Sequence, residues 1–226
     1  MEIYIIFIVI AVISYLVQSS LKNKFARYSK VPIPGGMTGK DIAEKMLHDN
    51  GINDVSVTHI DGQLTDHYNP ANKTVNLSKD VYFGNSVSAA AVAAHECGHA
   101  VQHATHYSFL SMRSNLVPVV SFASQWMTWI LLAGILLVQT VPQIMLVGII
   151  LFAITTIFSF ITLPVEINAS QRALAWLNGA NITYGQTQDQ ARDALKSAAY
   201  TYVVAALSSL ATLIYYIIIF MGRSRD

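Results

Sequence analysis

A run of 52 residues, from Ser114 to Val165, contains no Asp, Glu, Lys or Arg. A membrane-spanning helix needs about 20 predominantly apolar residues, so the run is long enough for two crossings. Gln139, Pro142 and Gln143 stand near its middle, where polar residues and a proline favour a turn. The run therefore predicts a transmembrane hairpin.

Two more uncharged stretches, residues 3–21 and 197–222, are each long enough for one further crossing. Charged residues make up only 12% of the chain, against roughly a quarter in soluble domains. The first stretch lacks a basic start and a small-residue cleavage site, which indicates a retained anchor rather than a signal peptide. The predicted segments are an N-terminal anchor (1–21), a catalytic segment (22–113), the hairpin (114–165), a helix (166–196) and a C-terminal transmembrane helix (197–222).

Basic residues beside these stretches predict the orientation of the chain in the cell membrane. By the positive-inside rule, they place segments 22–113 and 166–196 in the cytoplasm and both termini outside. Arg223 and Arg225 argue the other way. The net charge of +1 gives no reason to expect a nucleic-acid partner. The basic residues on the predicted cytoplasmic side are Lys22, Lys24, Arg27, Lys30, Arg113, Arg172, Arg192 and Lys196.

The predicted cytoplasmic segment has short elements of both kinds. Residues 38–50 predict a capped amphipathic helix, with Thr38 three residues before Asp41. Residues 55–60 and 74–78 alternate like strands, and we expect them to form a small antiparallel sheet. An edge strand just before the next helix can bind an extended peptide by strand addition. The alternative is a hairpin that only covers that helix.

Residues 88–106 read SAAAVAAHECGHAVQHATH and predict an Ala-rich helix with Ser86 as its N-cap. His95, Glu96 and His99 form an H-E-x-x-H, which places two imidazoles on one helical face and a carboxylate beside a metal-bound water. This pattern predicts a catalytic site for one zinc ion (Zn²⁺). The alternative, a chance match, is disfavoured because the whole chain has few histidines and glutamates.

The third zinc ligand must come from elsewhere in the chain. Along a helix axis, His103 lies about 12 Å from His95, which is too far for both to bind one ion. We therefore interpret His103 and His106 as polar residues near the helix end. The alternative for His103 is a contact with the substrate. Glu166 directly follows the hairpin, which returns it to the membrane face of the motif. The alternative is that Glu166 only ends the span at the interface.

These segments together resemble the YugP-type neutral zinc metallopeptidases, bacterial membrane proteins of the gluzincin kind. The resemblance runs from the N-terminal anchor through DHYNPANKTVNLS and AAHECGHAVQH to LPVEINASQRAL. It implies zinc ligation by His95, His99 and Glu166, with Glu96 as catalytic acid/base. The family usually has an acidic residue where this chain has Asn168, and an amide there can still accept a hydrogen bond from a ligand histidine.

The expected protein is thus a mainly α-helical integral membrane protein. It has about four transmembrane helices and a small cytoplasmic zincin-like α+β catalytic domain. As a metalloendopeptidase it would hydrolyse protein or peptide substrates at the cytoplasmic membrane face, with Glu96 activating the zinc-bound water. The candidates for stabilising the oxyanion are Arg172, Tyr68, His67 and His103.

Two other functions fit the motif less well. An intramembrane protease would carry the motif inside a membrane helix, where the polar residues of 87–106 are expensive. A non-catalytic zinc-binding scaffold, or a degenerate protease, would have a closed site of four side chains, usually including cysteine. Cys97 is the single cysteine, and two residues after His95 it faces away from the metal. The oligomeric state has no signal in the sequence.

Overall fold

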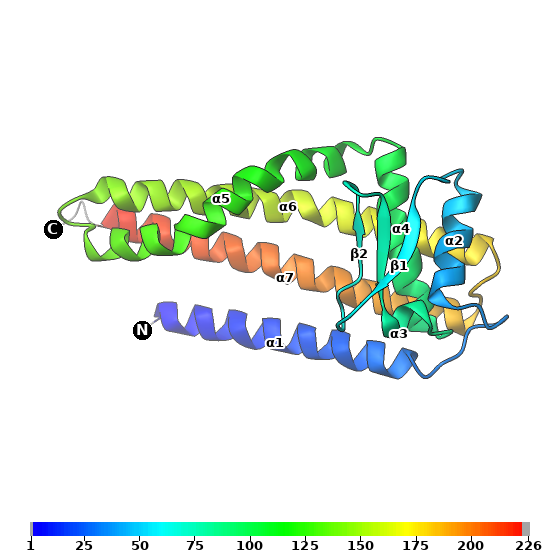
Figure 1. Cartoon of the computed structure of the whole chain (residues 1–226). Coiled ribbons are helices and arrows are strands. Elements are labelled where there is room, and N and C mark those ends of the chain that lie inside the picture. Colours follow the sequence, from blue (N-terminus) through cyan, green and yellow to red (C-terminus); the bar gives the residue numbers. More distant parts are fainter. Residues whose placement is uncertain (1, 223–226) are drawn as a thin grey trace.

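The computed structural model describes residues 2–222, and the side chains of residues 7–222. Long helices extend from a compact head, and the start of α1 and the end of α7 lie at the end of the molecule opposite that head (Figure 1). The long helices are α1 (Glu2–Tyr28), α5 (Ser108–Leu136), α6 (Pro142–Gly179) and α7 (Gln186–Gly222). The head contains α2 (Gly39–Asp49), β1 (Ser56–Ile60), β2 (His67–Asn69), β3 (Thr74–Ser78), α3 (Lys79–Tyr82) and α4 (Val87–Ala104).

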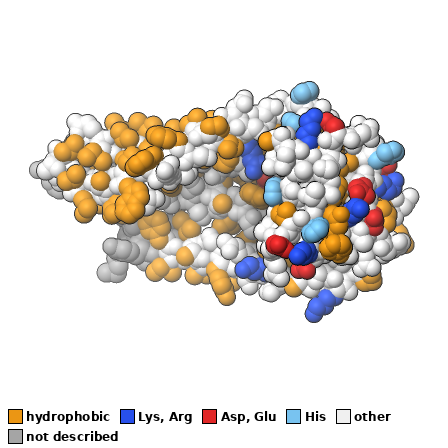
Figure 2. Space-filling view, viewed as in Figure 1, with side chains coloured by type: hydrophobic (Ala, Val, Ile, Leu, Met, Phe, Trp, Pro, Cys, Tyr) orange, Lys and Arg blue, Asp and Glu red, His pale blue; other side chains and the backbone are white. Residues whose placement is uncertain are grey.

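Among the described residues, three helices are long and apolar enough to cross a membrane: α5, α6 and α7. Hydrophobic side chains gather over the long helices, whereas charged side chains gather over the head (Figure 2). The predicted crossing at residues 3–21 belongs to α1, which packs along α7. It stays a prediction, because the side chains of residues 3–6 lie outside those described, as do Arg223 and Arg225.

The predicted hairpin is formed by α5 and α6, which pack against each other after a short turn. Two glycines bring the helices together. A Cβ on Gly134 would lie 2.6 Å from the Met145 Cα, and one on Gly148 would lie 2.7 Å from a methyl carbon of Leu131. Because a side chain at Gly134 would clash with the backbone of α6, this glycine limits how closely the two helices approach, whereas a side chain at Gly148 would displace the Leu131 side chain.

The prediction of one helix over residues 166–196 is wrong. The helix that carries Glu166 is the end of α6, which stops at Gly179, and a turn then leads into α7. Asn181 and Gly185 have φ angles of 54° and 51° in this turn, a conformation that asparagine and glycine adopt more readily than other residues. The asparagine and the glycine are therefore the residues from which the sequence could have predicted that the helix ends here.

The prediction for residues 38–50 is confirmed by α2. The Thr38 side chain accepts a hydrogen bond from the Asp41 N–H, and the Asp41 carboxylate accepts one from the Thr38 N–H. This reciprocal pair satisfies two backbone donors that the first helical turn leaves free. The apolar face of this amphipathic helix, formed by Ile42, Met46 and Leu47, is buried in the core of the head.

The prediction of an antiparallel pair between residues 55–60 and 74–78 is wrong. The strand order is β1-β3-β2, with β1 parallel to β3 and only β2 antiparallel to it. The prediction missed β2, a three-residue strand in a segment whose residues are typical of a turn. It forms the hairpin with β3 and leaves the other side of β3 for β1. The strand just before the motif helix is therefore central, and β2 is the edge strand beside α4.

The motif helix α4 begins and ends close to the predicted positions. Ser86 is its N-cap, accepting a hydrogen bond from the Ala89 N–H. Its small residues are almost all buried, since α2, α6, α7 and the sheet pack around it. A helix with larger side chains could not lie so close to this many neighbours. The motif is therefore carried by the best-packed helix of the head.

Candidate metal centre

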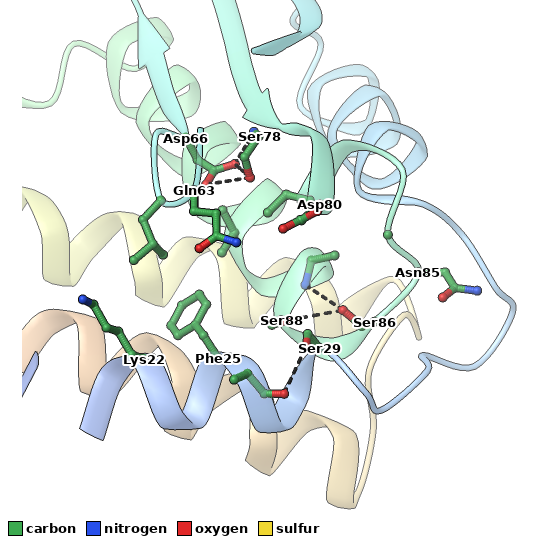
Figure 3. A pocket seen from close by; sticks show the side chains of 16 residues that line it. Lys22, Phe25, Ser29, Gln63, Asp66, Ser78, Asp80, Asn85, Ser86 and Ser88 are labelled. Carbon is green, nitrogen blue, oxygen red and sulfur yellow. Dashed lines mark hydrogen bonds between the residues drawn. The ribbon is translucent and has the colours of Figure 1, made fainter. Parts of the chain in front are cut away.

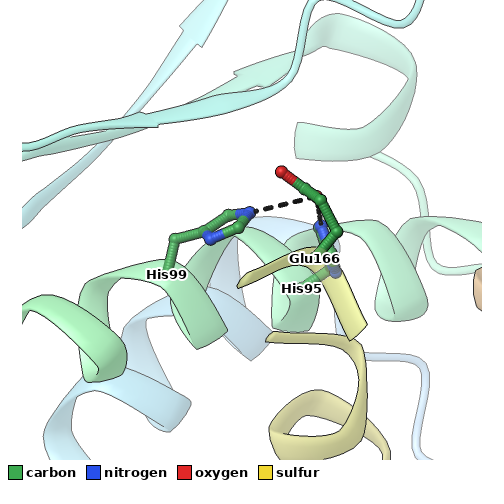
Figure 4. A group of neighbouring side chains, drawn as sticks. All are labelled: His95, His99 and Glu166. Atoms are coloured by element: carbon green, nitrogen blue, oxygen red, sulfur yellow. Dashed lines mark ion pairs between the residues drawn. The ribbon is translucent and has the colours of Figure 1, made fainter. Parts of the chain in front are cut away.

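His95, His99 and Glu166 meet where α4 crosses α6 (Figure 4). We call these three residues the cluster. Their ligand atoms all lie within 4.8 Å of one another. Glu166 Oε2 lies 3.3 Å from the Nε2 atom of His95 and 3.6 Å from that of His99. Among the residues that the structure describes, this is the one group of at least three metal-ligating side chains with such spacing.

The crossing of α4 and α6 depends on Gly98, which lies inside the motif. A Cβ at this position would lie 2.6 Å from the carbonyl oxygen of Ala169, three residues after Glu166. Real Cβ atoms do not approach a backbone oxygen so closely, so only glycine lets α6 pass at this distance. Gly98 thus positions the Glu166 carboxylate beside the two imidazoles.

Hydrogen bonds orient both imidazoles with Nε2 toward Glu166. The His95 Nδ1 atom lies 3.1 Å from the Ser170 hydroxyl, and the His99 Nδ1 atom lies 3.0 Å from Gln102 Oε1. The Gln102 Nε2 donates to the Val165 carbonyl, so its oxygen is the atom that faces His99. An N–H on His99 Nδ1 leaves Nε2 free to bind a metal.

Asn168 contacts Gln102, whereas the sequence suggested a contact with one of the two histidines. Its Oδ1 accepts hydrogen bonds from Gln102 Nε2 at 3.0 Å and from Arg172 Nε at 2.8 Å. Asn168 therefore supports Gln102, which in turn orients His99. Arg172, predicted as an oxyanion donor, is the outer end of this chain and does not line the cavity at the metal centre.

Gln102→Ala tests this chain of contacts. The change removes the acceptor for the His99 N–H, so the imidazole loses its preferred tautomer and orientation. We expect zinc affinity to fall by about 10–100-fold, as for other contacts that orient metal ligands. Competition with a chelating dye measures it. Gln18→Ala on α1, outside the cluster and its hydrogen-bond partners, is the control and should keep the original affinity.

Glu96 lies beside the cluster and is almost fully buried. Its Oε2 accepts a hydrogen bond of 3.1 Å from the backbone N–H of Tyr68 on β2. The edge strand therefore fixes one carboxylate oxygen and leaves the other for another partner. A carboxylate held in this way is suited to take a proton from a neighbouring molecule.

A cavity of about 680 Å³ opens on the cluster, and we call it the metal cavity. It contains three of the four predicted oxyanion donors: His67, Tyr68 and His103. The Tyr68 hydroxyl lies 2.9 Å from His103 Nδ1, so these two side chains form a pair at the cavity wall. His106 also lines it, just past the end of α4.

Two further residues of the metal cavity, Arg113 and Tyr202, were missed as site residues. Arg113 Nη1 lies 3.7 Å from Glu166 Oε1. The signal was present, because Arg113 and Glu166 are the charged residues on either side of the uncharged hairpin, and a hairpin brings its two ends together. Tyr202 comes from α7, where nothing distinguishes it from the other tyrosines of an apolar helix.

Burial and charge act in opposite directions on His99. Burial is the largest single effect and disfavours its protonated form, but the interaction with the Glu166 carboxylate, the negative charge of Glu96 and the contact with Gln102 together outweigh it and raise the pKa of His99 above its ordinary value. For the Cys97 thiol, burial and the nearby charge of Glu96 act in the same direction. Burial raises the pKa of its thiol, and its S–H lies 3.5 Å from the Ala43 carbonyl oxygen. Cys97 is therefore a packing residue on the face of α4 away from the cluster.

Known proteins match this chain over nearly its whole length. A family model described as "Putative neutral zinc metallopeptidase" matches residues 3–221. The chain is also 42% identical to a protein of Bacillus subtilis (strain 168) described as "Putative membrane protease YugP", over 98% of this chain and 99% of the relative. No solved structure matches the chain.

Proposed function

The chain belongs to the neutral zinc metallopeptidase family, and from this premise we propose that it hydrolyses peptide bonds at one zinc ion held by His95, His99 and Glu166. The observation that carries the proposal is the convergence of these three ligand atoms within 4.8 Å. Two histidines and a glutamate are a ligand set of catalytic zinc sites, which keep a fourth position for water. The hydrogen bonds at both Nδ1 atoms fit the same role.

Glu96 is the proposed general acid/base of the reaction. A zinc ion held by His95, His99 and Glu166 would act as a Lewis acid, making a bound water more acidic and polarising the scissile carbonyl. Glu96 takes the proton of the attacking water and passes it to the leaving amine. The Tyr68 N–H holds the Glu96 carboxylate for both transfers. Tyr68 and His103, paired at the cavity wall, are the proposed donors to the negative charge that develops on the carbonyl oxygen.

The proposed location of the site is the cytoplasmic surface of the cell membrane. Three described helices are long and apolar enough to span the bilayer, and α1 would be the fourth. The basic residues beside the spans support the cytoplasmic orientation by the positive-inside rule. Substrates would then be proteins or peptides that reach this surface.

Chelation and reconstitution test the proposal. The purified protein is expected to cleave casein, to lose at least about 90% of this activity when a chelator removes its zinc, and to regain it with one equivalent of zinc, because a metal-free site has no Lewis acid. Activity that survives complete zinc removal would contradict the proposed mechanism. Zinc binding without any cleavage would favour a non-catalytic scaffold.

A further inference from the structure

Two further cavities follow one another on the side of the metal cavity that faces α1. A small cavity of about 150 Å³, the throat, adjoins the metal cavity. A third cavity of about 620 Å³, the α1 cavity, lies beyond the throat. The residues shared by the metal cavity and the throat are Asp66, His95, Glu96, Glu166 and Tyr202. Those shared by the throat and the α1 cavity are Phe25, Leu64, Asp66 and Val92.

The polar residues of the throat are Asp66 and those around the metal centre, namely His95, Glu96, Glu166, Ser170 and Tyr202. The apolar walls of the throat come from helices far apart in the sequence and from the loop after β1. A side chain next to a scissile bond at the metal centre would enter this space. Because apolar groups gain free energy on leaving water, the throat favours an apolar side chain. The apolar residues that line it are Leu21, Phe25, Leu64, Val92, Leu195, Ala198 and Ala199.

The α1 cavity has mixed polarity (Figure 3). The Phe25 ring rises from α1 toward the loop that contains Gln63 and Asp66. Hydroxyl and amide groups from the residue just after α1, from this loop and from the start of α4 stand beside apolar carbon. A polypeptide backbone needs both kinds of surface, because each of its residues has a donor and an acceptor. A lipid tail would need only the apolar surface.

Leu64 stands where the throat meets the α1 cavity. It has a φ angle of 58° and its side chain is 55% exposed, although leucine rarely adopts a positive φ. The Asp66 carboxylate, two residues later, accepts hydrogen bonds from the N–H and the hydroxyl of Ser78. The loop is thus tied to the end of β3, with an apolar side chain held beside the passage. Such strain is typical of ligand-binding segments.

We propose that these three cavities form one substrate channel, in which an extended polypeptide runs from the metal cavity through the throat into the α1 cavity. The proposal rests on the proposed function and adds a substrate class: internal segments of unfolded chains, with an apolar side chain in the throat next to the scissile bond. It also makes α1 a wall of the binding site in addition to its proposed role as a membrane anchor.

Peptide binding to the full-length Glu96→Gln protein tests the channel without any need for cleavage. A peptide of about ten residues spans roughly 33 Å when extended, and one of about four residues spans roughly 13 Å. Both carry the same central sequence and a fluorescent label. We expect the longer peptide to bind at least about tenfold more tightly, which corresponds to about 1.4 kcal/mol. Equal affinities would overturn the proposal, whether or not the wild-type protein is a peptidase.

Blocking the α1 cavity gives the matched comparison. Ala26 and Asn23 are exposed residues of α1 one turn apart, and only Ala26 lines the cavity. In the same binding assay, Ala26→Trp should remove most of the advantage of the longer peptide, while Asn23→Trp should keep it. Ser29→Trp, at a second exposed position of the cavity, should repeat the effect if Ala26→Trp does not fold. An unchanged advantage in a folded cavity variant would contradict the channel.

The throat makes a separate prediction about cleavage. Products from a mixture of peptides should have Leu, Phe or another apolar residue at one side of the cut. Ala199→Phe reduces the space in the throat and should shift this preference toward Gly and Ala by about tenfold, or about 1.4 kcal/mol. Cuts beside charged residues at equal frequency would show that the throat does not hold the neighbouring side chain.

Discussion

Glu96→Gln is expected to lower kcat for peptide cleavage by about 10²–10⁴-fold, the range that general acid–base catalysis contributes. The amide has nearly the shape of the carboxylate, and its oxygen can still accept the Tyr68 N–H. It cannot take a proton from water at neutral pH, however. Since Glu96 is not a proposed ligand, zinc content should stay at the wild-type value.

The control for this variant is Glu44→Gln. Glu44 lies on α2, where it is exposed and pairs with Lys40 at 3.6 Å, so its loss should leave both cleavage and zinc content unchanged. Rates come from a quenched fluorescent peptide and zinc from elemental analysis of the same samples. Undiminished cleavage by Glu96→Gln would falsify the proposed role of this carboxylate. Loss of zinc would instead make Glu96 a ligand.

Gly98→Ala is expected to damage the metal centre without changing a ligand. The new methyl group would lie 2.6 Å from the Ala169 carbonyl oxygen, unless α4 and α6 move apart. Overpacking of this kind costs about 1–3 kcal/mol of unfolding free energy. The movement also carries Glu166 away from the histidines, so zinc affinity should fall by about tenfold or more, as when ligand-orienting contacts are lost.

Gly179→Ala provides the matched comparison for Gly98→Ala. Gly179 is the last residue of α6, and a Cβ there would meet no atom within 4 Å. It should keep zinc affinity and thermal stability close to the wild-type values. Thermal unfolding with and without zinc measures both effects. Wild-type zinc affinity in Gly98→Ala would mean that the α4–α6 distance does not determine the geometry of the cluster.

Local rules explain which elements were predictable from the sequence. The capped ends of α2 and α4 follow from Thr38, Asp41 and Ser86, whose side chains bond to backbone groups within one turn. The α5–α6 hairpin follows from the absence of charge, because a span excludes charged residues wherever its partners lie. The return of Glu166 to the end of the molecule that carries the histidines follows from the hairpin, whereas its close approach to them depends on the crossing of α4 and α6.

The remaining features depend on how distant segments pack. The sequences of β1 and β3 alone do not predict their pairing, because it depends on β2 occupying the other side of β3. Ser170 lies on α6, so its contact with His95 depends on the crossing of α4 and α6. Gln102 lies one turn after His99 on α4, but its orientation depends on Val165 and Asn168 of α6. Gly98 stands at a position of the motif where any residue is allowed, so its contact with Ala169 has no sequence signal of its own.

Glu166, brought back by the hairpin, is proposed to complete a zinc site begun by His95 and His99. The most direct test of this proposal is the zinc content of Glu166→Ala beside that of Glu44→Ala, both purified with their membrane segments intact. We expect about one zinc ion per chain in wild type and Glu44→Ala, and little or none in Glu166→Ala, because the loss of one of three protein ligands leaves an incomplete site. A full equivalent of tightly bound zinc in Glu166→Ala would contradict this proposal.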